Sequence, residues 1–342
     1  MKLSHFLIML FFTAAMFACI LFCNADIFIA TRNVSDEYKN YLTTSAISAI
    51  ESAEVDSSEV FKTEKSRDKT VTRFFDTLKL CFNIKGTYNE SIQLENTIPC
   101  VALIDNDGMY VNYRTTFKNS ADETEWTRVT SPLCSWGQQY GKYYMRFYLD
   151  NTIDVISTDN TKMEYKGNYH DVRILLLEDY TKRALSEDPE FRMSFLDSED
   201  AFIIEKSRII IAEVNKTINY YINQCNNTFI NVNKINYEYI MPIVADTDYS
   251  RLLTGPTVIS FMQGNQITRF PGYLNIYAIA GSEKTVGKSY TITTESINGS
   301  TYHFYHDINC SELDPNTDNK RTYSTMQECA KKGAYPCPNC IK

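Results

Sequence analysis

The chain begins with an apolar run that has no polar face. Residues Phe6 to Cys23 carry no charge, and Thr13 is the only polar side chain among them. A helix needs about 20 apolar residues to cross the ~30 Å hydrocarbon core of a bilayer. Asn24 and Ala25 bring the run to that length. The pattern therefore predicts a transmembrane anchor within residues 1–30.

The charges on either side of the run give its expected direction. The α-amino group and Lys2 precede it, whereas Asp26 and Arg32 follow it and roughly cancel. Positive charge near a membrane span is retained on the cytoplasmic side. We therefore expect a single-pass protein of the cell membrane, with a cytoplasmic N-terminus and the bulk of the chain extracytoplasmic.

A cleaved leader is the competing interpretation of the same run. A signal peptide cut before Asp26 has small residues in roughly the right place, but a signal core spans only about 7–15 residues. Residues 27–29 also continue the apolar character past that cut. A lipoprotein cut before Cys19 or Cys23 is less favoured still, because bulky residues precede both cysteines.

Behind the anchor, apolar positions recur at helical spacing. Val34, Tyr38, Leu42, Ala46, Ala49 and Ala53 lie three or four residues apart, which places them on one face of a helix. This stalk helix could cap its own domain or pack against copies of itself, since small residues allow close helix contact. Residues 57–69 are polar and predict a linker, and residues 71–82 return to helical spacing.

The next apolar segments have the short runs of β-strands. Residues 98–104 and 109–113 flank an Asp-Gly turn, and residues 143–149 and 152–157 flank Asp150-Asn151. Both patterns predict β-hairpins, with Gly108 expected to supply a positive φ in the first. A calcium loop at Asp105 to Asp107 is disfavoured because the acidic spacing does not continue.

The second half of the chain alternates helix and strand patterns. Residues 170–184 predict a helix, the acidic stretch 186–190 a boundary, and residues 197–224 a long helix with acidic residues at its start. Four short segments rich in β-branched and aromatic residues follow, at 237–244, 257–262, 273–280 and 289–294. The expected fold class is α+β, with a mixed helix and antiparallel-sheet ectodomain. The expected divisions are 1–30, 31–188, 189–300 and 301–342.

Composition narrows the range of functions. The net charge is −8 and the isoelectric point is near 5.2, and no stretch is dense in Lys or Arg. Nucleic acid is therefore not an expected partner. Twenty-four Tyr and nineteen Phe fit an exported, β-rich protein. Four of the ten cysteines lie in the body, where three disulfide pairings are open; they are Cys81, Cys100, Cys134 and Cys225.

The last 42 residues contain the strongest local chemistry. Two pairs of candidate ligands occur at the spacing of a tetrahedral structural zinc site, namely His306 with Cys310 and Cys337 with Cys340. A helix between the pairs is predicted to start near Ser324 and to stop at Gly333. Cys329 falls within it as a spare thiol. Disulfides among Cys310, Cys329, Cys337 and Cys340 are the alternative, because an oxidising exterior permits them.

Motifs for catalysis are missing from the sequence. There is no Walker loop, no Gly-x-Ser-x-Gly elbow, no His-Glu-x-x-His and no dinucleotide fingerprint. Paired carboxylates such as Asp105 with Asp107, or Asp246 with Asp248, are better explained as turn residues. We therefore expect a non-enzymatic protein.

Two family resemblances follow from these motifs. Residues 305–310 and 333–340 resemble the small cysteine-rich metal-binding modules of exported bacterial proteins and, more distantly, the Ada-type zinc fold, which has cysteine where this chain has His306. The apolar helix that runs into the Ala-rich stripe, the strands at 98–113 and the stretches at 261–264 and 273–281 are similar to those of pilin-like, Tad-type pilus-locus proteins.

The second resemblance implies a membrane-anchored extracytoplasmic subunit of a surface or pilus assembly apparatus. Its implied partners are the membrane, other envelope or pilus proteins, and copies of itself through residues 6–53. A ligand-binding ectodomain of Cache or PAS type, with the hairpin at 98–113 in its pocket, is the alternative hypothesis. A wall-modifying enzyme is the third.

Overall fold

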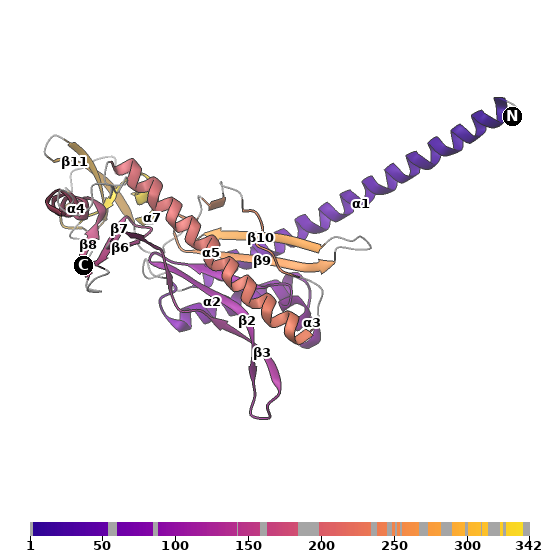
Figure 1. The fold of residues 1–342 in the computed structure, drawn as a ribbon, viewed down its shortest axis with the longest axis horizontal. Coiled ribbons are helices and arrows are strands. Elements are labelled where there is room, and N and C mark those ends of the chain that lie inside the picture. Colours follow the sequence, from indigo (N-terminus) through magenta and orange to yellow (C-terminus); the bar gives the residue numbers. More distant parts are fainter. Residues whose placement is uncertain are drawn as a thin grey trace.

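The protein is a long N-terminal helix attached to a mixed helix and antiparallel-sheet body (Figure 1). The computed structural model describes residues 3–53, 60–84, 88–141, 143–157, 163–183, 198–233, 238–244, 248–249, 252–253, 255–266, 273–281, 289–297, 300–308, 310–313, 322–323 and 326–337. The observed combination of elements confirms the expected α+β class.

Helix α1 (Leu3–Ser52) joins the expected anchor and stalk without a break. Its first half projects away from the body (Figure 1). The large apolar side chains there are exposed; Phe11, Phe17 and Phe22 are 70%, 70% and 73% exposed. This segment is long and apolar enough to cross a membrane.

The second half of α1 packs on the body through the predicted stripe. Leu42, Ala46 and Ala49 are fully buried, and Val34 and Tyr38 pack partly buried against the same cluster. Small residues at 46 and 49 allow α1 to approach helix α2 (Glu64–Cys81) closely. The stripe therefore contacts the chain's own domain.

The prediction of a linker at 57–69 is wrong for residues 64–69, because α2 already begins at Glu64. The Thr63 hydroxyl accepts a hydrogen bond from the Ser66 amide at 3.1 Å and caps the helix. The first turns of α2 are polar because they face solvent, so hydrophobic spacing alone did not reveal them. Helix α3 (Tyr88–Glu95), which follows, was also not predicted.

The central antiparallel sheet has the order β10-β9-β1-β2-β3, with β4 paired to β2. Its strands are β1 (Cys100–Ile104), β2 (Gly108–Lys118), β3 (Thr124–Thr130), β4 (Cys134–Ser135), β9 (Thr257–Gln266) and β10 (Tyr273–Gly281). Strand β1 pairs with β9 in the register Val101 to Ser260. The sheet thus contains strands from both sides of the expected boundary at 188, which lies outside the described residues.

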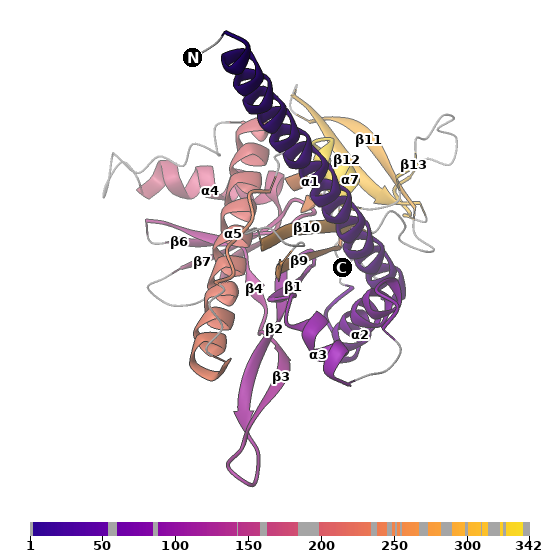
Figure 2. The same cartoon turned by 90° about the vertical axis from the view of Figure 1, so that its right-hand side faces the viewer.

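Helices cover both faces of this sheet. Val101 and Leu103 belong to the core shared with α1 and α2, whereas Cys100, Ala102 and Ile104 belong to the core shared with helix α5 (Glu199–Asn233). Figure 2 shows α5 on one side of the sheet and α1 with α2 on the other. Burial on both faces explains why the sequence of β1 is continuously apolar.

Two smaller sheets complete the described body. One has the order β5-β6-β7-β8, made of β5 (Gly137–Tyr140), β6 (Tyr143–Phe147), β7 (Thr152–Ser157) and β8 (Met163–Asn168), and it is followed by helix α4 (Tyr169–Arg183). The other has the order β13-β11-β12-β14, made of β11 (Tyr290–Ile297), β12 (Ser300–Asp307), β13 (Thr322–Tyr323) and β14 (Tyr335–Pro336).

Both predicted hairpins are present, but the reason why glycine is needed at position 108 differs from the one expected. The φ of Gly108 is not positive; the turn of the second hairpin has Asn151 at a φ of 66° instead. A Cβ on Gly108 would lie 2.6 Å from the carbonyl oxygen of Cys134, so close backbone approach requires glycine there. The strand expected at 237–244 is absent from its described part, residues 238–244, where the chain is irregular.

Candidate metal centre

The terminal candidate site is built on the hairpin of β11 and β12. Strand β14 lies parallel to β12, with Tyr305 opposite Pro336. The Cys337 amide then donates to the Tyr305 carbonyl at 3.0 Å, which extends this pairing by one residue. In a parallel pair of strands the next residue of one strand lies beside the next residue of the other. Cys337, which follows Pro336, therefore lies beside His306, which follows Tyr305.

A tight turn after β12 brings two further donors back to the same place. The Cys310 amide donates to the Asp307 carbonyl at 2.8 Å, and the Leu313 amide donates to the Cys310 carbonyl at 3.1 Å. Ligand atoms of His306, Cys310, Glu312 and Cys337 all lie within 4.8 Å of one another. This group could hold a metal ion.

The surroundings fix the imidazole of His306. Its Nε2 lies 2.8 Å from the Thr293 hydroxyl, and that hydroxyl also lies 3.5 Å from the Phe304 carbonyl. The ring nitrogen and the Thr293 hydroxyl share one hydrogen bond, whose direction depends on the tautomer of His306. Hydrogen bonding of the second ring nitrogen is what orients histidine ligands in metal sites.

The two thiols differ in their surroundings. Cys337 is fully buried and its thiol donates to Oε2 of Glu312 at 3.0 Å, whereas Cys310 is half-buried. Glu312 is exposed, so the group is closed on the β-sheet side and accessible at the carboxylate. Imidazole, thiolate and carboxylate are all zinc donors, and their binding of a metal would release the thiol protons.

The structure brings together three of the four predicted ligands, His306, Cys310 and Cys337. The fourth, Cys340, lies outside the described residues. Glu312 was not predicted, because acidic residues are common and a single Glu two positions after a cysteine carries no distinctive signal. Thr293 was also missed, since its contact with His306 exists only through the pairing of β11 with β12.

The other predictions for this region can be compared with helix α7 (Met326–Lys331). Gly333 has a φ of 81° and its amide donates to Ala330, which confirms the predicted stop. Cys329 is buried in a separate apolar cluster with Ala334. The start near Ser324 lies outside the described residues. Cys310 and Cys329 are free thiols, as are the four cysteines of the body, Cys81, Cys100, Cys134 and Cys225.

A buried polar network ties the site to the rest of the body. The side-chain amide of Asn151 donates to the carbonyls of Ala330 at 3.3 Å and Ala334 at 2.8 Å. Its oxygen accepts from the Lys206 ammonium of α5 at 2.5 Å. Burial lowers the pKa of Lys206 to about 8, and the nearby Asp150 opposes this shift. The terminal region is therefore fixed to α5 and to the turn between β6 and β7.

Comparisons of the chain with protein-family models, with curated proteins and with solved structures find no match. The functional argument therefore rests on the chain's own residues and geometry.

Proposed function

We propose that this chain is a non-enzymatic, membrane-anchored subunit of an extracytoplasmic surface or pilus assembly apparatus. Its N-terminus would be cytoplasmic and its body extracytoplasmic. The observation that carries the proposal is the continuity of α1 from the exposed apolar segment into the buried core.

A continuous helix makes the anchor and the body one mechanical unit. Leu42 and Ile50 are held in the core by α2 and by strands β9 and β10, so the direction of the apolar segment is set by the body. Subunits whose anchors pack side by side would then present their bodies at a fixed spacing and angle. A tether of flexible sequence would not transmit that order.

Self-association, on this proposal, uses only the exposed part of α1. The stripe at residues 34–53 is covered by the chain's own core. The exposed segment carries Cys19 and Cys23 one helical turn apart, and small residues at helix contacts favour packing in lipid. These two cysteines are suitable natural reporters of contact between copies.

We further propose that the terminal group binds zinc in a structural role. Its supporting observations are the mixed nitrogen, sulfur and oxygen donors within 4.8 Å and the oriented imidazole of His306. Four protein ligands leave no position for a reacting water. Zinc there would hold the turn at Cys310 against β14 and so complete the terminal region.

Oxidative cross-linking in native membranes tests the assembly proposal. We expect treatment with copper phenanthroline to convert the full chain into disulfide-linked dimers through Cys19 or Cys23. The double variant Cys19→Ser, Cys23→Ser should stay monomeric, and Cys134→Ser, which removes a half-buried thiol of the body, should cross-link like the unmodified chain. The proposal would lose its basis if only monomers were found. This result counts when a membrane protein known to assemble, present in the membrane at the same density, is cross-linked under the same conditions.

A further inference from the structure

A polar cavity lies where α2, α3 and the strands β2 and β3 meet, remote in sequence from the terminal cysteines. It has a volume of about 530 Å³, within the roughly 300–1,000 Å³ of small-molecule sites. Its lining includes three cations, Lys79, Arg114 and Arg128, one carboxylate, Glu95, and the aromatic rings of Tyr88 and Trp126.

Two arginines of this cavity are placed directly opposite each other. Arg114 on β2 pairs with Arg128 on β3 in the antiparallel register. Like charges opposite each other destabilise a sheet, and burial lowers the pKa of both groups, that of Arg128 to about 10 with Arg114 as a contributing cause. Such an arrangement has an unfavourable energy unless negative charge offsets it.

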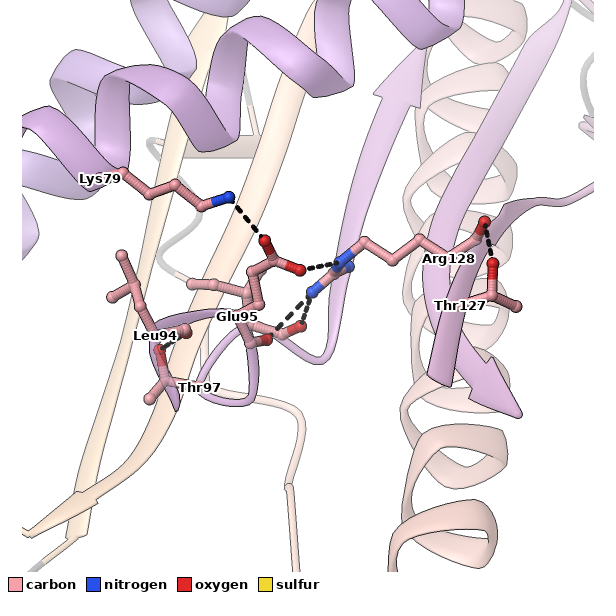
Figure 3. Close-up of polar contacts among 7 residues, drawn as sticks. Lys79, Leu94, Glu95, Thr97, Thr127 and Arg128 are labelled. Carbon is pink, nitrogen blue, oxygen red and sulfur yellow. Dashed lines mark hydrogen bonds and ion pairs between the residues drawn. The ribbon is translucent and has the colours of Figure 1, made fainter. Parts of the chain in front are cut away.

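The protein supplies one carboxylate to this group. Figure 3 shows Glu95 between Lys79 and Arg128. Oε1 of Glu95 lies 2.8 Å from the Lys79 ammonium, whereas Oε2 lies 3.9 Å from Nε of Arg128, beyond hydrogen-bond distance. Three cations and one carboxylate leave two positive charges on the cavity wall, in a chain whose net charge is −8.

The guanidinium of Arg128 is held in place by groups other than Glu95. Its Nη2 donates to the carbonyl of Glu95 at 3.0 Å (Figure 3) and to that of Ile98 at 2.7 Å, and its guanidinium carbon lies 4.2 Å from the ring centre of Phe75. Its Nε and Nη1 hydrogens find no acceptor among the described residues. The head group is thus positioned in advance, with donor capacity left over.

Arg114 is positioned by an aromatic ring. Its guanidinium carbon lies 4.7 Å from the centre of the Trp126 ring, and the residue is 4% exposed. Guanidinium groups present paired N–H donors that match the two oxygens of a carboxylate. The Lys79 ammonium adds a point charge at the same cavity.

We propose that this cavity binds a small organic dianion through its carboxylates, with a dicarboxylic acid as the ligand class. The two positive charges in excess match a dianion. The roles assigned are charge neutralisation by Arg128, binding of one carboxylate by Arg114, and binding of the other by Lys79. Trp126 and Ile92 border the same space and would contact the carbon chain.

Tryptophan fluorescence of the full chain in a nonionic detergent tests the proposal, with succinate as the probe. The chain has two tryptophans; Trp126 lines the cavity and Trp136 is fully buried elsewhere. We expect a saturable fluorescence change with succinate, none with the neutral isostere succinamide, and none in a Trp126→Phe variant.

Variants assign the response to the cavity. Lys79→Gln should weaken the apparent Kd for succinate about tenfold, as loss of a charge-assisted hydrogen bond does. Lys118→Gln, at the exposed end of β2 beside Asp122, is the matched control and should bind as the unmodified chain does. Arg114→Gln should abolish the fluorescence response to succinate. If the Arg114→Gln chain does not fold, the affinity of the Lys79→Gln variant for succinate still tests the proposal.

Three results would overturn the proposal. One is the absence of any saturable response to succinate, and another is equal binding by the Lys79→Gln variant and the unmodified chain. The third is a response to inorganic phosphate without one to succinate, which would assign the charge excess to a phosphate ligand and not to a dicarboxylic acid.

Discussion

The buried lysine of α5 gives the most quantitative prediction of the structure. Lys206 is 4% exposed, and its ammonium donates to the Asn151 side chain and to the Leu149 carbonyl. Burial lowers its pKa to about 8 from the ordinary value of 10.5. In the unfolded chain the side chain regains the ordinary value.

The sign of the pH dependence follows from proton binding. Between pH 8 and pH 10.5 the unfolded chain holds the Lys206 proton more tightly than the folded protein does, so stability rises with pH. With these two pKa values, the contribution of Lys206 to the free energy of unfolding increases by about 2–3 kcal/mol from pH 7 to pH 10. Other groups also titrate in this range. The contribution of Lys206 must therefore be measured as the difference in free energy of unfolding between the unmodified chain and a variant without this lysine.

The perturbation is Lys206→Met, which removes the titrating group and keeps the length of the side chain. Urea unfolding of both chains in detergent at half-unit pH intervals gives the difference in free energy of unfolding. We expect this difference to shift by about 2–3 kcal/mol in favour of the unmodified chain from pH 7 to pH 10. For the control Lys216→Met, at a side chain that is 73% exposed, the difference in free energy of unfolding should not change with pH. A constant difference for Lys206→Met as well would refute the reasoning.

Three further changes test how the body is held together. Asp105→Asn should lower the free energy of unfolding by about 2 kcal/mol in urea, because the buried carboxylate accepts three backbone N–H groups and an amide presents an N–H₂ to at least one of them. Gly108→Ala should cost about 1–3 kcal/mol in the same assay, since its Cβ would lie 2.6 Å from the Cys134 oxygen; a neutral result would contradict the close approach. Phe74→Ala in the fully buried core should cost about 3–5 kcal/mol and Leu80→Ala, 73% exposed on the same helix, much less; equal losses would contradict the assigned core face.

The elements that sequence patterns predicted well are those whose signal is local. The apolar run at 6–23 and the stripe that begins at Val34 lie on one helix, because the run is continuously apolar and the stripe recurs at helical spacing. The hairpins at Gly108 and Asn151 were predictable from turn residues. Helix α5 was found for the same reason, although it runs on to Asn233.

The features that were missed depend on contacts between distant parts of the chain. Strand β9 pairs with β1 across more than 150 residues, and no local pattern specifies that partner. The pairing of β11 with β12 is likewise what places Thr293 against His306.

Three side chains of the candidate sites show the same dependence on contacts between distant parts of the chain. Glu312 joins the metal donors only after the turn at Cys310 folds back. Arg114 and Arg128 are unremarkable in the sequence and form a like-charge pair only through the register of β2 and β3. Local patterns thus predict elements, and the sheets decide which side chains meet.

The metal content of the purified full chain tests the account of the terminal centre most directly. When the chain is purified without chelators and analysed by inductively coupled plasma mass spectrometry, we expect about one zinc ion per chain. His306→Ala and Cys337→Ser should each lose it, and Cys329→Ser, which removes the buried thiol of the neighbouring cluster, should retain it. A metal-free chain in which Cys310 and Cys337 are joined by a disulfide would contradict the account.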